Sequence, residues 1–360
     1  MALGKLALGL DIGSKSVKLV QLKCQRRRGQ FGYLLQNFGM KALPLEAIVD
    51  GALMNSTAIV QAMQALLEEL KIKQKEVAIS VSGHSVIIKK ISMPKMTQEE
   101  LEESIQWEAE QYIPFDVKDV NIDTQILNDG QSDAAGQMDV LLVAAKKDMI
   151  NDYTSVVSEA GLTPVVVDVD AFAVQNMFST NYDIVSEGSV VLINAGASIV
   201  NINILSNGNT VFTRDVSIGG NHFTEELQKQ LNISFEEAEA LKIGGNLSET
   251  DAVVPHDVEK VIAAVADQVA GEIQRSLDFY AGTAAETNFT KVYLSGGTAK
   301  IPALVKIIES RVGVPVEIVN PFRNITVDER RFSSAQLQEI GPMAAVAMGL
   351  ALRHSGDKFD

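Results

Sequence analysis

Cysteine and histidine are scarce in this chain, which limits the metal and redox chemistry that it can carry. The 360 residues include one cysteine, Cys24, and four histidines, at positions 84, 222, 256 and 354. A single cysteine can form neither an internal disulfide nor a cysteine-rich zinc site. The histidines lack H-x-x-x-H spacing, so no histidine metal centre is expected. The composition fits a reducing compartment.

Long apolar runs are missing as well. No stretch of about 18 uncharged apolar residues occurs, so we expect no transmembrane helix. The apolar N-terminal segment meets Asp11 early, and no small-residue cleavage site follows, so no signal peptide is expected. The C-terminal residues 354–360 are polar and lack the pattern of an amphipathic membrane helix. These features predict a cytoplasmic protein.

Positive charge is in deficit, and two common nucleotide-binding motifs are absent. Lys and Arg number 31 against 46 Asp and Glu, which gives a formal net charge of −15. This balance argues against non-specific binding to nucleic acid, which needs cations to neutralise phosphates. The basic run at 26–28 is interpreted as a solvated hairpin tip. Neither GxGxxG nor GxxxxGK[ST] occurs, so neither a Rossmann dinucleotide site nor a P-loop is supported.

The length and the order of predicted elements indicate two domains and an inserted module. A chain of 360 residues exceeds one ordinary core, and its strand-like and helix-like segments alternate in an α/β order. Ser56 or Thr57 is expected to cap one helix, and Thr97 and Glu100 form a T-x-x-E capping box before another. The predicted divisions are a first domain core at 1–84 and 164–185, an inserted small αβ subdomain at 85–163, a second domain at 186–353 with a helical part at about 220–285, and a polar tail at 354–360.

A weak internal repeat links two glycine turns. The segment DIGSKSVKL from Asp11 aligns with NAGASIVNI from Asn194, so that Gly13 meets Gly196. Both segments are predicted to form strand, tight turn and strand, and similar elements follow each of them. The repeat predicts a duplication with two facing hairpins, although nine residues can also match by chance.

The residue types of the first turn suit a phosphate group. Backbone N–H groups in a tight turn can hold phosphate where no Cβ blocks the approach, and Gly13 permits this. Ser14 and Ser16 add hydroxyl donors, and Lys15 or Lys18 adds positive charge.

The second glycine hairpin would close on the same phosphates across a cleft between the domains. Asp11 would then face a magnesium ion through water, because Mg²⁺ keeps several waters beside substrate phosphates. Taken alone, D-x-G and N-x-G are also common hairpin turns, so each stretch has a purely structural interpretation.

A third glycine turn points to a nucleoside. Gly296 and Gly297 follow a predicted strand and precede a helix that carries Lys300. A glycine pair allows the backbone to lie flat against a purine or its ribose. Glu239 and Lys242 share one helical face at i, i+3, where they could contact ribose and base or form a simple surface ion pair.

Taken in order, these segments resemble the actin-like ATPase superfamily of actin, sugar kinases, heat-shock chaperones and FtsA. DIGSKSVK looks like its first phosphate loop, with Lys18 at the family lysine position, and INAGASIVNI looks like the second. EAEALK is similar to the nucleoside contact, LSGGTAKIPAL to the adenosine loop, and DVDAFAVQNMF and GPMAAVAMGLALR to two connecting helices. Across residues 8–353, the resemblance implies an α/β actin-like fold of two ribonuclease H-like domains around a cleft for ATP and Mg²⁺. It implies nucleotide contacts at Gly13, Ser14, Lys15, Ser16, Lys18, Asn194, Gly196, Ala197, Gly219, Glu239, Lys242, Gly296, Gly297 and Lys300, and a water-mediated magnesium contact at Asp11.

The inserted module gives a closer resemblance. Residues 93–127 look like the small subdomain of the PilM family of type IV pilus assembly proteins, a module that FtsA also carries in relocated form. This resemblance implies a cytoplasmic ATP-binding adaptor at the inner face of the inner membrane. Its expected partner is the cytoplasmic N-terminal peptide of the membrane protein PilN, and other inner-membrane or motor proteins of the pilus are further candidates.

In the family, the PilN peptide lies between the first domain core and the inserted module. By position, the helix at 101–112 and the strands at 80–91 and 139–145 would line this groove. Trp107 and Tyr112 could belong to it or could simply pack in the module.

One position departs from the superfamily pattern. The second phosphate loop usually begins D-x-G, whereas this chain has Asn194. The loss of a carboxylate beside the metal predicts weak Mg²⁺ retention and slow or absent hydrolysis. No catalytic residue is assigned; Asp168 and Asp170 are the nearest candidates for a general base, and both could instead cap a helix. A filament-forming division protein of the FtsA type and a small-molecule kinase remain alternatives.

Overall fold

The computed structural model describes residues 5–27, 30–127, 136–183, 188–244, 256–284 and 288–357. Part of the predicted hairpin tip at 26–28 lies outside these ranges. In the described ranges, no helix is both long enough and apolar enough to cross a bilayer.

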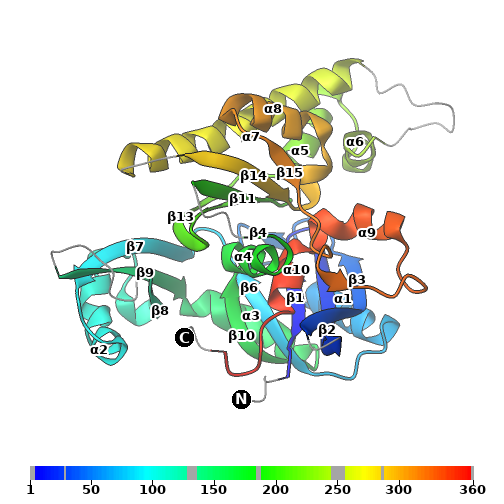
Figure 1. Ribbon diagram of the computed structural model, residues 1–360. Helices are drawn as coiled ribbons and strands as arrows, with labels where there is room; N and C mark the ends of the chain where they lie inside the picture. Colours follow the sequence, from blue (N-terminus) through cyan, green and yellow to red (C-terminus); the bar gives the residue numbers. More distant parts are fainter. Residues whose placement is uncertain are drawn as a thin grey trace.

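Two main sheets lie one above the other in Figure 1. The first sheet has six strands, in which β1, β2 and β3 form an antiparallel meander and β1, β6 and β10 run parallel. In spatial order these strands are β10 (Thr163–Val169), β6 (Glu76–Val81), β1 (Leu8–Ile12), β2 (Ser16–Arg27), β3 (Gln30–Ala42) and β16 (Ile325–Thr326).

The second sheet repeats this topology with five strands. Its first three strands form an antiparallel meander, and its last two continue from the meander's first strand in parallel. In spatial order they are β13 (Asn209–Val216), β12 (Val200–Ser206), β11 (Ser189–Ala195), β14 (Phe289–Ser295) and β15 (Val316–Ile318). The shared order of five strands confirms the predicted duplication.

The two glycine turns have matching geometry. Asp11 pairs with Lys18 across the first hairpin, and Asn194 pairs with Asn201 across the second, seven residues on in each case. The Gly13 N–H donates to the residue three positions later at 3.2 Å, and the Gly196 N–H does the same at 2.9 Å. The residues that align in the sequence therefore occupy equivalent places in the two hairpins.

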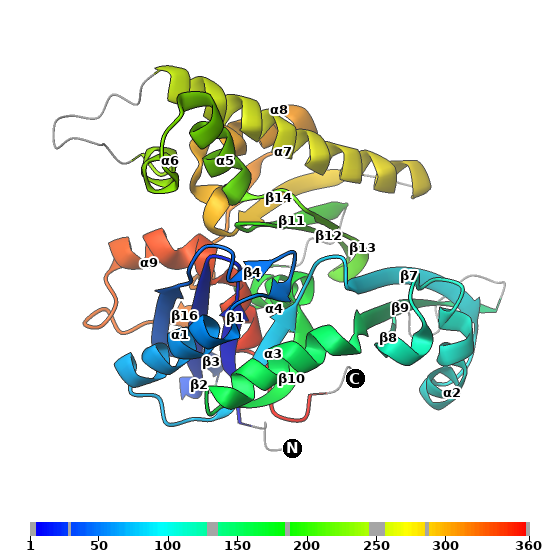
Figure 2. The ribbon, with the colours of Figure 1, turned by 180° about the vertical axis from the view of Figure 1, so that it is seen from behind.

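Helices form three layers around the two sheets, as Figures 1 and 2 show. Below the first sheet, α1 (Ser56–Glu69) and α3 (Lys147–Glu159) pack on its strands. Between the sheets, α4 (Asp170–Asn181) and α10 (Ala345–Leu350) share one hydrophobic core with strands of both. The outer face of the second sheet is covered by α5 (Gly220–Leu231), α6 (Phe235–Lys242), α7 (His256–Thr283) and α8 (Pro302–Val312).

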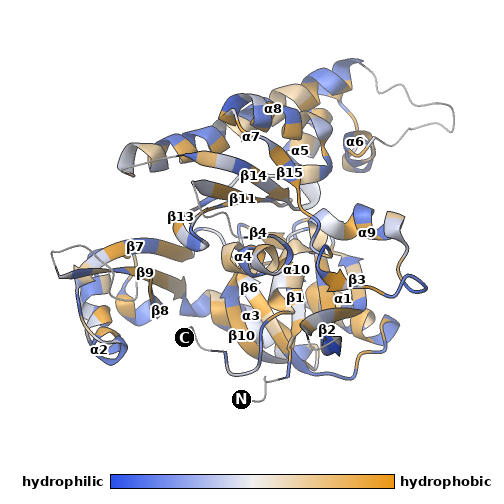
Figure 3. Cartoon of the chain, viewed as in Figure 1, coloured by the Kyte–Doolittle hydropathy of each residue, from blue (hydrophilic) through white to orange (hydrophobic). Residues whose placement is uncertain are grey.

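These layers define two lobes. The first lobe is the six-stranded sheet with α1 and α3, and the second lobe is the five-stranded sheet with α5 to α8. Figure 3 shows hydrophobic residues along the strands and hydrophilic residues on the outer side of α7. The chain returns to the first lobe late, because β16 pairs with β3 and α10 packs on β1. The remaining short elements are β4 (Ile48–Val49), β5 (Ala52–Leu53), η2 (Gly297–Lys300), α9 (Ser334–Ile340) and η3 (Gly341–Ala344).

A separate three-stranded module projects from the first lobe beside β13 (Figures 1 and 2). It consists of β7 (Val86–Pro94), α2 (Gln98–Ala109), η1 (Val117–Asp119), β8 (Val120–Ile126) and β9 (Gln137–Lys146), with its own hydrophobic core. The predicted capping box is confirmed, since Glu100 N–H donates to Thr97 Oγ1 at 3.2 Å and Thr97 N–H donates to the Glu100 carboxylate at 2.8 Å. The predicted cap of α1 was wrong by one residue, because Asn55 fills that role.

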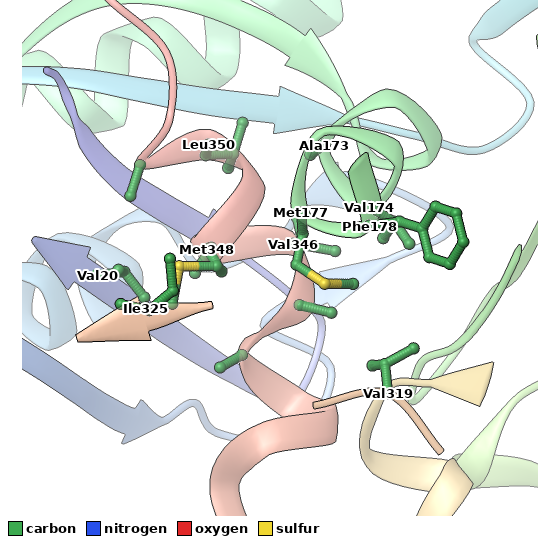
Figure 4. Packing of buried hydrophobic residues seen from close by; sticks show 14 of the residues in the cluster. Val20, Ala173, Val174, Met177, Phe178, Val319, Ile325, Val346, Met348 and Leu350 are labelled. Carbon is green, nitrogen blue, oxygen red and sulfur yellow. The ribbon is translucent and has the colours of Figure 1, made fainter. Parts of the chain in front are cut away.

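The contact between α4 and α10 depends on glycine. A Cβ at Gly349 would lie 1.7 Å from the carbonyl oxygen of Ala173, and a Cβ at Gly9 would lie 2.0 Å from that of Ala347. Figure 4 shows the surrounding side chains, among them Met177 and Val346, packed between the two helices and β16. Two glycines therefore allow α10 to lie directly on both α4 and β1.

We expect Gly349→Ala to destabilise the protein by about 3 kcal/mol or more, because a rigid backbone oxygen occupies the place of the new methyl group. Chemical denaturation measures the change. The matched control is Gly271→Ala in α7, where a Cβ meets nothing within 4 Å and should instead add about 0.5–1 kcal/mol. Equal stability of the two variants would contradict the close packing of α10 on α4.

Candidate functional site

The two glycine turns meet between the lobes. Ser198 Oγ, in the second turn, donates to Ser14 Oγ, in the first, at 2.9 Å. Next to this contact, the Lys15 ammonium bonds to the Glu239 carboxylate of α6. The prediction of facing hairpins is confirmed, and each turn presents a hydroxyl to the other.

Lys18 and Asp11 form a shielded ion pair beside the first turn. Lys18 Nζ lies 2.9 Å from Asp11 Oδ2, and only 14% and 11% of the two side chains are exposed. A Cβ at Gly13 would lie 3.2 Å from the same Nζ, so the ammonium lies over the turn. Within the residues that the structure describes, no group of three His, Cys, Asp or Glu side chains could hold a metal ion.

The start of α5 is bound tightly to the second turn. The Gly196 carbonyl accepts from Gly220 N–H at 3.0 Å, and the Ala197 carbonyl accepts from Asn221 N–H at 2.8 Å. A Cβ at Gly219 would lie 2.6 Å from the Ala197 oxygen. Only glycine therefore allows the helix to begin so close to the turn, and Gly196, Ala197 and Gly219 form one surface.

Glu239 lies at the centre of a charged cluster. Its carboxylate accepts from Lys242 Nζ at 2.6 Å and from Thr224 Oγ1 at 2.8 Å, in addition to Lys15. Burial by itself would raise the pKa of Glu239, but the bonds from Lys15 and Lys242 outweigh it and hold the pKa below its ordinary value. Burial lowers the pKa of Lys242, although Glu239 opposes this. The pair is thus shielded and connected to the first turn, and it is not a simple surface pair.

The third glycine turn lies against the second hairpin. Gly296 has φ +89°, and a Cβ there would lie 2.2 Å from the Ala195 carbonyl oxygen. From the same turn, Thr298 Oγ1 donates to the Gly196 carbonyl at 2.8 Å. Gly297 lies next to it in η2, whereas Lys300 Nζ is 3.7 Å from Glu339 of α9. The structure therefore joins Gly296 and Gly297 to the site and directs Lys300 towards α9.

The two aspartates at the start of α4 differ in their surroundings. Neither caps the helix, whose N-cap is Val169. Asp168 lies 3.5 Å from Arg353 near the C-terminus. Asp170 accepts from Ser80 Oγ at 2.5 Å, and burial, followed by the charge of Asp11, raises its pKa to about 6. Of the two candidate bases, Asp170 therefore faces Asp11 and the first turn.

Asn194 is held on both sides. Its Nδ2 donates to Asn201 Oδ1 at 3.0 Å, and its Oδ1 accepts from Ser295 Oγ at 3.3 Å. The sequence prediction missed four residues that complete the site. They are Ser198, Asn221, Thr224 and Thr298. The signal for Ser198 was available, since the repeat aligns it with Lys15, whereas the other three come from helices that only tertiary packing brings to the turns.

Comparison with known proteins assigns the chain to one family. The model of the family described as type IV pilus assembly protein PilM matches residues 9–355. Among solved structures, a PilM–PilN type IV pilus biogenesis complex contains a chain with 30% identity and a TM-score of 0.85, with 98% of this chain and 99% of that chain covered.

More distant relatives share the fold. The ethanolamine utilization protein EutJ of Carboxydothermus hydrogenoformans has 16% identity and a TM-score of 0.57, covering 97% of this chain and 89% of that one. Cell division protein FtsA of Streptococcus pneumoniae is 21% identical over 87% of this chain and 75% of its own length. The fold is the actin-like one that the sequence predicted.

The raised pKa of Asp170 predicts how its replacement changes stability with pH. The native carboxyl titrates near pH 6 and the unfolded one near 3.8, so the native state holds the extra proton between these values and loses stability as the pH rises through them. Asp170→Asn should therefore stabilise the protein at pH 7.5 by up to about 3 kcal/mol, at 1.36 kcal/mol per pKa unit. The gain should shrink by pH 5, and thermal melts of both proteins at the two pH values measure it. A pH-independent difference would contradict the raised pKa.

Proposed function

Because the chain belongs to the family of type IV pilus assembly protein PilM, we propose that it is a nucleotide-binding adaptor of pilus assembly. It would bind ATP between its lobes and hold the cytoplasmic N-terminal segment of PilN at the inner face of the inner membrane. The observation that carries the nucleotide part is the contact of the two glycine turns through Ser14 and Ser198 at 2.9 Å.

The contacts between the turns are of a kind that a polyphosphate can replace. Hydroxyl groups of Ser14, Ser16 and Ser198 donate equally well to phosphate oxygens, and Lys15 can exchange the Glu239 carboxylate for a phosphate. Lys18 can likewise turn from Asp11 to phosphate, which would leave Asp11 to face a hydrated Mg²⁺. The first hairpin therefore offers two hydroxyl groups and two ammonium groups, and the second offers one hydroxyl group, without any change of fold.

The nucleoside would lie beside the second lobe. Gly296 and Gly297 offer a flat backbone, and Lys242 is bonded to Glu239 close to the second turn. When Lys15 moves to phosphate, Glu239 regains an acceptor oxygen for ribose hydroxyls. Binding of ATP would then exchange one ion pair between the lobes for contacts to the ligand.

Binding without rapid turnover fits the residues at the second turn. Asn194 brings no negative charge to hold Mg²⁺, and its amide is already bonded to Asn201 and Ser295. Asp170, with its raised pKa, is the carboxyl best suited to act as a general base, but it faces Asp11 beside the first turn. We therefore propose a nucleotide sensor with weak or absent ATPase activity.

The partner follows from the solved PilM–PilN complex that this chain resembles over nearly its full length. The three-stranded module supplies an exposed aromatic side chain for such contact, since Trp107 on α2 is 77% exposed, while Tyr112 packs partly in the module core. Attachment through PilN would place the protein at the membrane.

Gly13→Ala tests the nucleotide proposal. The new methyl group would lie 3.2 Å from the flexible Lys18 side chain and 3.3 Å from the Ser16 carbonyl oxygen, so a small shift of these neighbours should accommodate it, but it would block the approach of phosphate to the turn. Titration calorimetry should show at least a tenfold loss of ATP affinity, about 1.4 kcal/mol. Gly32→Ala, at a position with nothing within 4 Å, is the matched control and should bind like the wild type. ATP binding that is absent in the wild type, or unchanged in Gly13→Ala, would refute the proposal.

The single tryptophan allows a direct test of the peptide. Because the chain has one Trp and it is exposed on the module, a synthetic PilN N-terminal peptide that binds there should change the fluorescence of Trp107. Short peptides should give dissociation constants in the micromolar to millimolar range, roughly −8 to −4 kcal/mol. A scrambled peptide is the control. If calorimetry detects no binding of the PilN peptide, the FtsA-like alternative gains support.

A further inference from the structure

A chain of hydrogen bonds leads from the second glycine turn to the root of the three-stranded module. Asn194 Nδ2 donates to Asn201 Oδ1 at 3.0 Å, and Asn201 Nδ2 donates to Asp215 Oδ1 at 2.8 Å. The other carboxylate oxygen of Asp215 accepts from the backbone N–H of Gly83 at 2.6 Å. The last bond crosses from the second lobe to the first.

Gly83 stands where the module is attached. Its carbonyl accepts from Val86 N–H at the start of β7, at 3.0 Å, and the neighbouring Ser85 carbonyl accepts from Lys146 N–H at the end of β9, also at 3.0 Å. A shift of Gly83 would therefore displace both strands, β7 and β9, that connect the module to the first lobe. Figures 1 and 2 show β13, which carries Asp215, lying beside β7.

Packing supports the same connection. Gly83 has φ +90°, and a Cβ there would lie 3.1 Å from the side chain of Ile199. Ile199 belongs to the second turn, where its carbonyl accepts from Gly196 N–H at 2.9 Å. Gly83 thus lies beside the turn and is linked to it through the three polar side chains.

The direction of the donors explains why residue 194 is an amide. The side-chain amide of Asn201 has one nitrogen and one oxygen. Its Nδ2 donates to Asp215, so its Oδ1 has to accept a hydrogen bond from residue 194. An aspartate there has no hydrogen to give, and in either orientation of Asn201 two oxygens would face each other. Since Asn201 is only 3% exposed, water could not relieve that conflict.

We infer that the chain of Asn194, Asn201 and Asp215 couples the position of the second glycine turn to the root of the three-stranded module at Gly83. The inference rests on the proposed function and adds its regulation: nucleotide contacts at the turn would change how the module is held, and partner binding at the module would change nucleotide affinity in return. Coupling of this kind is reciprocal for binding free energies. The residues act by positioning, since Asp215 accepts from Asn201 Nδ2 on one side and from Gly83 N–H on the other.

Reversing the direction of the hydrogen bonds tests the series formed by Asn194, Asn201 and Asp215. Asn194→Asp should lower the melting temperature by roughly 3 °C or more, because it places oxygen against oxygen in a buried site. Adding Asp215→Asn should restore most of the loss, since Asn201 can then donate to residue 194 and accept from residue 215, while the new amide oxygen still accepts from Gly83 N–H. Losses that simply add in the double variant would overturn the inference.

Hydrogen–deuterium exchange tests the coupling. In the full-length wild type, saturating ATP and Mg²⁺ should change amide exchange at 82–90 and 139–146 at least twofold, and Asp215→Ala should abolish the response. Thr210→Val is the matched control: Thr210 lies on β13 like Asp215, is itself buried and donates to Gln175 at 2.6 Å, but it is not part of the hydrogen-bonded series that leads to Gly83. This control should keep the response.

The outcomes separate the two proposals. If calorimetry shows that the wild type binds no ATP, the proposed function fails and the coupling fails with it. If ATP binds but the exchange response is absent in the wild type, or is equal in wild type and Asp215→Ala, only the coupling is overturned. Loss of the response in both Asp215→Ala and Thr210→Val would also overturn it, because the effect would then not be specific to Asp215.

Discussion

The close contact of α4 with α10 sets the spacing on which the rest of the molecule depends. These helices form the layer between the two sheets, and Gly349 lets their backbones meet without an intervening side chain. Each sheet packs on one side of this layer, so its thickness decides how far the two hairpins stand apart. A thicker layer would separate Ser14 from Ser198, whose hydroxyls lie 2.9 Å apart.

Two kinds of interaction hold the lobes together, and they differ in how easily they can be exchanged. The helix layer is apolar and close-packed, so it resists small changes. The contacts nearer the turns are hydroxyl pairs and ion pairs, such as Lys15 with Glu239, which an anionic ligand can replace. The combination suits a protein that keeps one architecture while its ligand state changes.

The amides of the second hairpin give the departure from the superfamily pattern a physical meaning. The sequence showed only that Asn194 lacks the negative charge of the aspartate usual at this position in the superfamily. In the structure it is a donor in a series of hydrogen bonds that passes through the buried Asn201 and ends at Gly83. A carboxylate at 194 would suit a metal but would break this series, so the two demands compete at one position.

The sequence alone determined the features that depend on local chemistry. Strand–turn–strand patterns located both hairpins, because a glycine turn between alternating residues specifies a hairpin within a dozen positions. The Thr97 and Glu100 capping box was readable for the same reason. The nine-residue repeat indicated the duplication, since equivalent residues meet equivalent neighbours.

Only the tertiary structure decided which distant groups meet. No local pattern says that β16 returns to the first sheet, that Lys300 pairs with Glu339, or that Asp170 faces Asp11 while Asp168 faces Arg353. These outcomes depend on packing between segments far apart in the sequence and on the direction of the side chains where β10 passes into α4. Short-range propensity carries no information about either, because both are set by the thickness and register of the helix layer between the sheets.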